Sequence, residues 1–344
     1  MPNFNSTRPR LINTIEKFLD AYKNNSLKGS KISNINFEYE NCTLKPELDA
    51  FLAKRDFSGL ELINCKFDNM DLESANFEKA VLSKCSFKVA MLDGANFEKS
   101  NLTYCDFTHA LMNNANFKGA KGSGCGFVYA ILKNSNFTGA LMGTETKDNI
   151  LKRICDFDGA EMQSSILDNA DFQNARFVGT ELNNASVKKT CFHSATMNGA
   201  VLDDVKGDRT VFDYAHMRYA SFKNAQLANS MFERANLIHS EMQKGDFSTS
   251  CFLHAFLDQV NAENANFSES NMSECGMRST NLKNANLERC NFRASDLYKV
   301  DLRDAKLNET DFTQVRELLR IKANKDEIVK ARLASGALEL MILS

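Results

Sequence analysis

The hydrophobic residues of this chain recur every five positions. From Phe57 to Phe312, 47 of the 52 positions whose number ends in 2 or 7 hold Phe, Leu, Met or Val. The exceptions are Gly122, Lys147, Lys152, Gly207 and Ala262. Two places before each large residue stands a smaller one, usually Ala, Cys, Ser or Thr, often with Asn or Asp between them. A period of five fits neither a helix nor a flat strand.

This spacing predicts a chain that turns a corner every five residues, with the small and large residues inside. Ala75-Asn76-Phe77 recurs every 20 residues, and so do four cysteines, which are Cys65, Cys85, Cys105 and Cys125. Over residues 57 to 142, Phe alternates with Leu or Met every ten residues. We therefore expect coils of four sides, in which Phe fills two opposite sides.

The unit small–Asn/Asp–large–x–x resembles the consensus of the pentapeptide-repeat family, Ala-Asp/Asn-Leu/Phe-x-x. The resemblance covers residues 57–312 in one continuous register. It implies an all-β fold, a right-handed quadrilateral parallel β-helix of about 13 coils, which at roughly 4.8 Å per coil gives a rod of about 62 Å. Such a stack buries its inward residues only between neighbouring coils.

The flanking segments predict short helical caps, because a stacked rod exposes unpaired backbone edges at its ends. Residues 1–56 are expected to form an N-terminal cap with a partial first coil, and 313–344 a C-terminal cap. The predicted helices span residues 8–24, 46–54, 314–320 and 325–340. The pattern lapses over 143–154, which reads as a loop or as a partner contact. The apolar segment 337–343 either packs on the last coil or forms a homodimer contact.

Composition excludes several function classes. The net charge is −2 and the pI about 6.3, so direct binding of nucleic acid is not expected. No apolar run is long enough to span a membrane, and no classical signal peptide begins the sequence. We expect a soluble protein, either cytoplasmic or delivered into a host cell by a bacterial secretion system.

The candidate chemistry is sparse. A straight column of cysteines cannot surround a zinc ion, and buried free cysteines are good small core residues. The five histidines fall in outward slots, without a nucleophile and supporting acid at suggestive spacing. We therefore expect no enzyme activity, no cofactor and no metal site.

One outward cluster predicts a partner-binding surface. Tyr214, His216, Arg218 and Tyr219 belong to a single predicted coil. Adding 20 places Arg234 above Tyr214 and His239 above Tyr219, and adding 20 again places His254 above Arg234. Tyrosine and arginine are favoured at the centres of protein interfaces.

The leading hypothesis is therefore a non-catalytic scaffold that binds a protein partner. The family resemblance includes secreted effectors of intracellular bacteria, so a host partner is one expectation. The alternative is a DNA mimic that binds or protects a type II topoisomerase such as gyrase. That mechanism requires a strongly negative face, whereas residues 238–312 hold 12 acidic against 8 basic residues.

Overall fold

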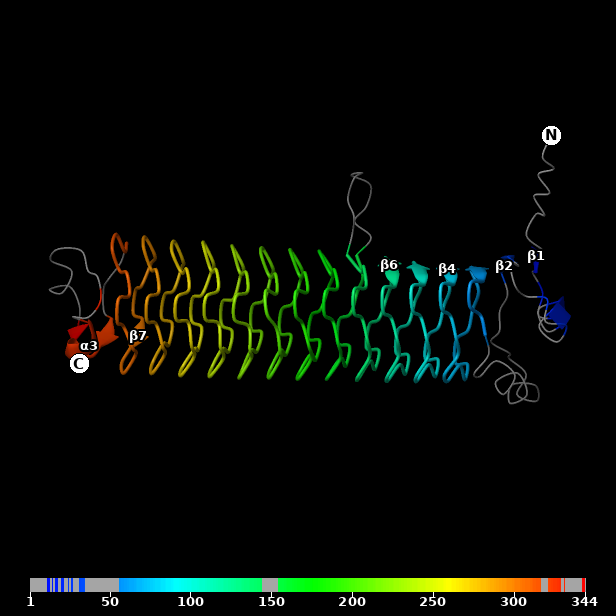
Figure 1. The fold of residues 1–344 in the computed structure, drawn as a ribbon, viewed down its shortest axis with the longest axis horizontal. Helices are drawn as coiled ribbons and strands as arrows, with labels where there is room; N and C mark the ends of the chain where they lie inside the picture. Colours follow the sequence, from blue (N-terminus) through cyan, green and yellow to red (C-terminus); the bar gives the residue numbers. More distant parts are fainter. Residues whose placement is uncertain are drawn as a thin grey trace, which may run out of the picture.

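The computed structural model describes residues 11–12, 14, 16–17, 20–21, 24, 26, 31–34, 56–143, 154–316, 321–328, 331 and 342–343. They form a parallel β-solenoid of about 12 turns. The turns stack into a long rod with β2 near one end and β7 near the other (Figure 1). The predicted β-helix is confirmed.

Most of the sheet pairing consists of very short strands and single bridges. One parallel sheet runs in the order β1-β2-β3-β4-β5-β6 and a second in the order β7-β8-β9. The strands of the first sheet are β1 (Leu11–Ile12), β2 (Lys31–Ser33), β3 (Glu61–Ile63), β4 (Val81–Ser83), β5 (Asn101–Thr103) and β6 (Lys121–Ser123). The remaining elements are β7 (Asp301–Leu302), β8 (Lys322–Ala323), α3 (Lys325–Ile328) and β9 (Ile342–Leu343).

Four pairings per coil define four faces. Face 1 contains the bridge Asp56–Asn76, face 2 the pairing of β3 with β4, face 3 the bridge Lys66–Ser86 and face 4 the bridge Asp71–Met91. Each pairing joins residues 20 apart, so the sequence period sets the coil. Each corner is named below by the two faces that it joins.

The core consists of stacked side chains from the two inward slots. Phe57 and Phe77 on face 1 stack with ring centroids 4.9 Å apart, and Phe67 and Phe87 on face 3 repeat this distance. Phe57 meets Phe67 edge to face at 6.1 Å across the interior, a favourable aromatic geometry. Leu62 and Leu72 fill the other two sides and are fully buried. The predicted alternation of Phe and Leu on opposite sides is confirmed here.

The corners require backbone that the repeat pattern did not reveal. The residue two places after each large residue has a positive φ, for example +52° at Asn64 and +57° at Val89. Only glycine, and to a lesser degree Asn and Asp, adopts this conformation cheaply. The frequency of Asn and Gly at positions ending in 4 or 9 was the sequence signal for it.

The predicted helical caps are not seen in the described residues, apart from short pieces. Leu11 and Ile12 form β1 and pair with β2, although Glu16, Lys17, Asp20 and Ala21 are helical. At the other end α3 covers four residues, Ala331 is not helical, and Ile342–Leu343 pair with β8. Added strands pair with the open edges, which removes the need for a helix there. The helix predicted over 46–54 lies outside the described residues, as does most of 314–320.

The interruption accounts for half a turn of the difference between 13 predicted and about 12 observed turns. Gly126 pairs with Asp156, and Leu141 with Asp171, so this coil contains 30 residues instead of 20. Residues 144–153 lie outside the described part. The prediction counted these ten residues as two more sides, whereas the described coils before and after them are direct neighbours: Phe127 and Phe157 stack with ring centroids 4.7 Å apart.

Candidate functional site

The predicted surface residues lie on face 3 and its two corners. Tyr214 occupies corner 2/3, His216 the face itself, and Arg218 and Tyr219 the turn at corner 3/4 of one coil. Backbone hydrogen bonds place Arg234 and His239 in the next coil, at the same two corners. His254 follows Arg234 one coil further. All seven predicted residues therefore share one side of three adjacent coils.

The side chains stack along the rod, as the 20-residue offset predicts. The rings of Tyr219 and His239 are parallel, with centroids 4.8 Å apart. The Arg218 guanidinium lies 5.7 Å from the Tyr219 ring, and that of Arg234 lies 5.7 Å from the Tyr214 ring. Cation–π contacts of this length restrict long side chains that would otherwise be mobile. The surface is therefore partly organised before any partner binds.

The structure adds Phe256, which the sequence analysis missed. This side chain is 50% exposed, because it occupies an outward slot of face 3 while Leu257 takes the inward slot. It lies in the column His216–Asn236–Phe256–Gly276. A Phe one place out of register, in Ala255-Phe256-Leu257, was the available signal. We call Tyr214, His216, Arg218, Tyr219, Arg234, His239, His254 and Phe256 the aromatic face.

Acidic side chains adjoin two residues of the aromatic face. Burial raises the pKa of Asp213, although its carboxylate accepts the backbone N–H of Glu233 at 2.8 Å. His254 Nδ1 lies 3.5 Å from a Glu274 carboxylate oxygen. Arg218 makes no ion pair among the described residues, so its charge is available to a ligand.

The buried cysteines of the column hydrogen-bond to the backbone of the neighbouring coil, as structural core residues do. Cys85 and Cys105 donate to the carbonyl oxygens of Leu62 and Leu82 at 3.3 and 3.4 Å. The hydrogen bond with the Cys105 thiol, together with burial, raises the pKa of Cys85 to about 12, so this thiol stays protonated and unreactive. Within the described ranges, no cluster of three or more His, Cys, Asp or Glu side chains could hold a metal ion.

A polar hollow lies on another side of the rod, between Ser268, Glu269, Asn286, Glu288, Arg289 and Asn308. Its cation, Arg289, is already paired with Glu269 at 3.3 Å and Glu309 at 3.1 Å. The hollow therefore has its one lining cation already paired, and it offers little apolar surface for a small molecule.

Two models of this repeat match the sequence. A "pentapeptide repeat region" matches residues 60–137, and "pentapeptide repeats (8 copies)" match 155–193, 215–252, 252–283 and 275–314. Together they cover more than half of the chain. The chain belongs to the pentapeptide-repeat family. No curated protein matches it in sequence.

Several solved structures of pentapeptide-repeat proteins are similar to this one. HetL from the cyanobacterium Nostoc sp. strain PCC 7120, involved in heterocyst differentiation regulation, is 17% identical, with 88% of this chain and 97% of HetL covered and a TM-score of 0.23. QnrB1, a plasmid-mediated fluoroquinolone resistance protein, is 15% identical, with 68% and 96% covered and a TM-score of 0.27. A protein of the Arabidopsis thaliana thylakoid lumen is 20% identical, with 39% and 69% covered and a TM-score of 0.14. At these identities the likeness concerns the fold alone.

None of the helical segments in the described residues has the length and apolar character of a membrane span.

Proposed function

We propose that this pentapeptide-repeat protein is a non-catalytic scaffold that binds a protein partner on its aromatic face. The observation that carries the proposal is the half-exposed ring of Phe256, in a slot that holds Asn236 one coil below. Exposing a ring of this size to water costs free energy that a partner would recover by covering it. Tyr214 and Tyr219 are 41% and 60% exposed on the adjoining corners.

The composition of the aromatic face fits a protein better than a small molecule or a nucleic acid. Aromatic residues and arginine are enriched at the energetic centres of protein interfaces. The stacked contacts and the rigid coils reduce the ordering cost of binding. The partner should offer an apolar side chain to Phe256 and a carboxylate to Arg218, whose guanidinium lies on Tyr219.

The arrangement does not favour catalysis. His254 is held toward Glu274 on an outer corner, and the side chains of Tyr214, Tyr219 and Phe256 are 41%, 60% and 50% exposed, whereas a catalytic site excludes water from the reacting bond. Binding is therefore the function that we propose for these side chains.

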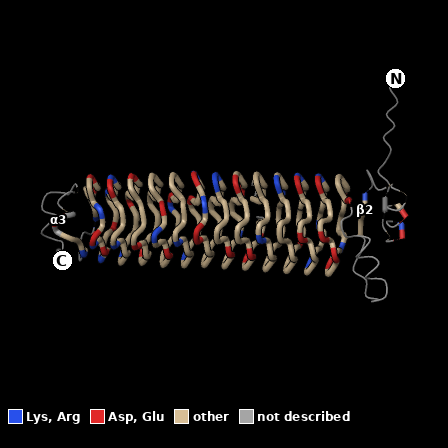
Figure 2. Tube along the Cα trace, turned by 60° about the horizontal axis from the view of Figure 1, so that its bottom comes forward, with Lys and Arg blue, Asp and Glu red and all other residues tan. Residues whose placement is uncertain are grey.

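The charge pattern favours a scaffold over a DNA mimic. Lys and Arg are interspersed with Asp and Glu along the rod (Figure 2), whereas a mimic of DNA would present continuous negative charge. The topoisomerase alternative makes a separate prediction. Purified protein would change the supercoiling activity of DNA gyrase, and replacing Phe256 would not alter that effect.

The test compares the wild-type protein with Phe256→Asn as bait in bacterial and eukaryotic lysates. Asn already occupies the equivalent slot at Asn236, so the variant should fold. Met231→Asn is the matched control, because Met231 is 41% exposed on face 2 and Asn271 occupies the same column. We expect a protein that the wild type and the control capture and that Phe256→Asn loses, confirmed by direct binding with the purified components. If every captured protein binds all three baits equally, the aromatic face is not the binding surface. The lysate that supplies the partner decides between a bacterial and a host setting.

A further inference from the structure

Along corner 3/4, the residue types at the corner position of seven successive coils follow the same order in both directions of the rod. Backbone hydrogen bonds between coils place Tyr129, Gly159, Gly179, Gly199 and Tyr219 in five successive coils. His109 precedes Tyr129 by one coil and His239 follows Tyr219 by one coil. The order His-Tyr-Gly-Gly-Gly-Tyr-His is therefore centred on Gly179.

The exposed side chains of Tyr129 and Tyr219 lie on either side of the three glycines. Tyr129 is 59% exposed and Tyr219 60% exposed. Each is supported from outside by its histidine, with ring centroids 5.3 Å apart for His109–Tyr129 and 4.8 Å for Tyr219–His239. The Tyr129 ring lies over Gly159, where a β-carbon would come within 2.4 Å of it. Beyond it, Gly179 and Gly199 leave the corner without side chains.

A two-fold axis at Gly179 would place these groups opposite their counterparts in a second, antiparallel copy. In such an isologous contact a residue a given number of coils below the axis meets the residue equally far above it. Tyr129 would then meet Tyr219 of the second copy, with the side-chain-free glycines allowing close approach of the two backbones between them.

The charges on the adjoining edge of face 3 are complementary in this arrangement. Lys88 lies four coils from Gly179 on one side and Asp258 four coils on the other. Asp68 and Arg278 are each five coils away on opposite sides. Both pairs therefore join opposite charges. Nearer the axis, Val128 would meet Arg218, and Thr108 would meet Ile238. Ten coil steps at roughly 4.8 Å give a contact about 48 Å long, enough for the roughly 800 Å² per copy of a standard interface.

The edge of face 4 is not complementary. Glu181 lies level with Gly179 and would face the same residue of the second copy. This like-charge contact opposes packing on that side, so the contact must incline toward face 3.

We infer that a second copy of this chain packs antiparallel along corner 3/4, with its two-fold axis at Gly179. The contact overlaps the proposed partner site at Arg218, Tyr219 and His239, whereas Phe256, Tyr214, His216 and Arg234 stay accessible. In this dimer the partner sites of the two copies would lie on the same side. Self-association is measured without any partner, so either proposal can fail alone.

The decisive variant is Gly179→Lys, with Gly139→Lys as control. Both glycines have φ +64° and nothing within 4 Å of an added β-carbon, and the chain already holds Lys189 at φ +55°. Gly139 lies on corner 1/2, diagonally opposite. In analytical ultracentrifugation we expect the wild type and Gly139→Lys to dimerise and Gly179→Lys to dimerise at least about tenfold more weakly. Asp258→Asn, which keeps an oxygen for the Arg278 N–H, should weaken the dimer and reduce its salt dependence.

Small-angle X-ray scattering separates this dimer from one through the C-terminal segment. A side-by-side dimer keeps nearly the maximum dimension of the monomer, whereas an end-to-end dimer nearly doubles it. A wild type that is monomeric at about 100 µM, equal dimerisation of the two lysine variants, or a doubled length would each overturn the inference.

Discussion

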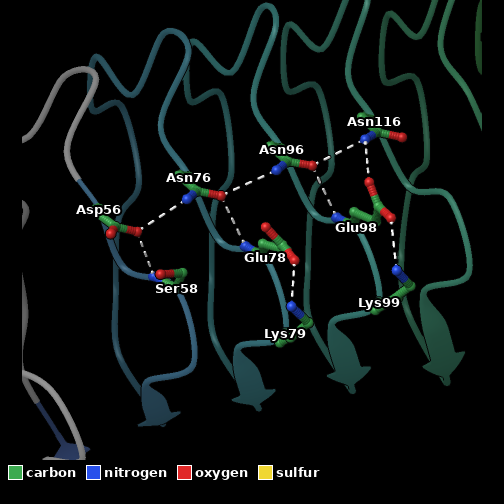
Figure 3. Close-up of polar contacts among 9 residues, drawn as sticks. All are labelled: Asp56, Ser58, Asn76, Glu78, Lys79, Asn96, Glu98, Lys99 and Asn116. Atoms are coloured by element: carbon green, nitrogen blue, oxygen red, sulfur yellow. Dashed lines mark hydrogen bonds and ion pairs between the residues drawn. The ribbon is translucent and has the colours of Figure 1, made fainter.

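The side-chain amide of Asn96 donates to Oδ1 of Asn76, one coil away, at 3.1 Å. The same Asn76 oxygen accepts the backbone N–H of Glu78 at 3.1 Å. Figure 3 shows this relationship repeated from Asp56 to Asn116, forming a ladder along face 1. The ladder thus fixes the turn within each coil and the spacing between coils with one side chain.

Replacing Asn96 by alanine should destabilise the rod. The change removes the bonds to Asn76, to the N–H of Glu98 and from Asn116, for a loss of about 2–3 kcal/mol in the free energy of unfolding. Asn101→Ala is the control, because its side chain only accepts from Thr103 in the described contacts. Urea unfolding measures both. Equal stability of the two variants would mean that the ladder is not a structural element.

Replacing Val89 by asparagine should stabilise the protein. Val89 is β-branched, 53% exposed and held at φ +57°, a region that disfavours β-branched residues most strongly and asparagine much less. We expect a gain of about 0.5–1 kcal/mol. Val81→Asn, at an exposed strand position of β4, should give no gain. Thermal unfolding of both variants provides the test, and an equal effect at both sites would rule out the conformational explanation.

The two kinds of phenylalanine should differ sharply in their contribution to stability. Phe97 is fully buried and stacks on Phe77 at 5.0 Å and on Phe117 at 4.9 Å. Phe97→Ala should therefore cost about 3–5 kcal/mol. Phe256→Ala should change the free energy of unfolding by less than about 0.5 kcal/mol, because half of its ring is in water already. A comparable loss for Phe256→Ala would assign that ring a role in packing.

Stability should fall at alkaline pH because of the buried thiols. The pKa of Cys85 and that of Cys290 are raised to about 12 from 9.0, mainly by the hydrogen bond with Cys105 in the first case and by burial in the second. Between these values the unfolded chain loses both protons and the folded chain keeps them, so unfolding becomes more favourable as pH rises, by up to about 1.4 kcal/mol per pH unit and thiol. The double variant Cys85→Ala/Cys290→Ala should lose less stability than the wild type between about pH 9 and 11. Identical pH profiles would contradict the assigned shifts.

The coils and their buried residues could be predicted from the repeat in the sequence. The features of single residues that depart from the repeat could not. The five-residue period correctly predicts that Phe57, Leu62 and Phe67 are buried. The period could not predict the positive φ of Val89, because that backbone conformation is imposed by the corner and does not depend on the residue that occupies it. Phe256 was missed because the search for surface residues followed polar and cationic types.

The ends of the rod could not be predicted from local propensity. Leu11 and Ile12 lie in a segment with helical spacing, yet they form β1 because an open strand edge nearby offers backbone partners. For the same reason Ile342 and Leu343 pair with β8. Tertiary pairing decides such segments, and a single sequence does not reveal which edge is available.

The 30-residue coil separates the length of this chain from the length of the rod. Phe127 and Phe157 stack at 4.7 Å across it, as closely as Phe107 and Phe127 do at 4.9 Å within ordinary coils. New material can thus enter at a corner without changing the height at which later side chains stand. The molecule can acquire new appendages while every existing surface keeps its position along the axis.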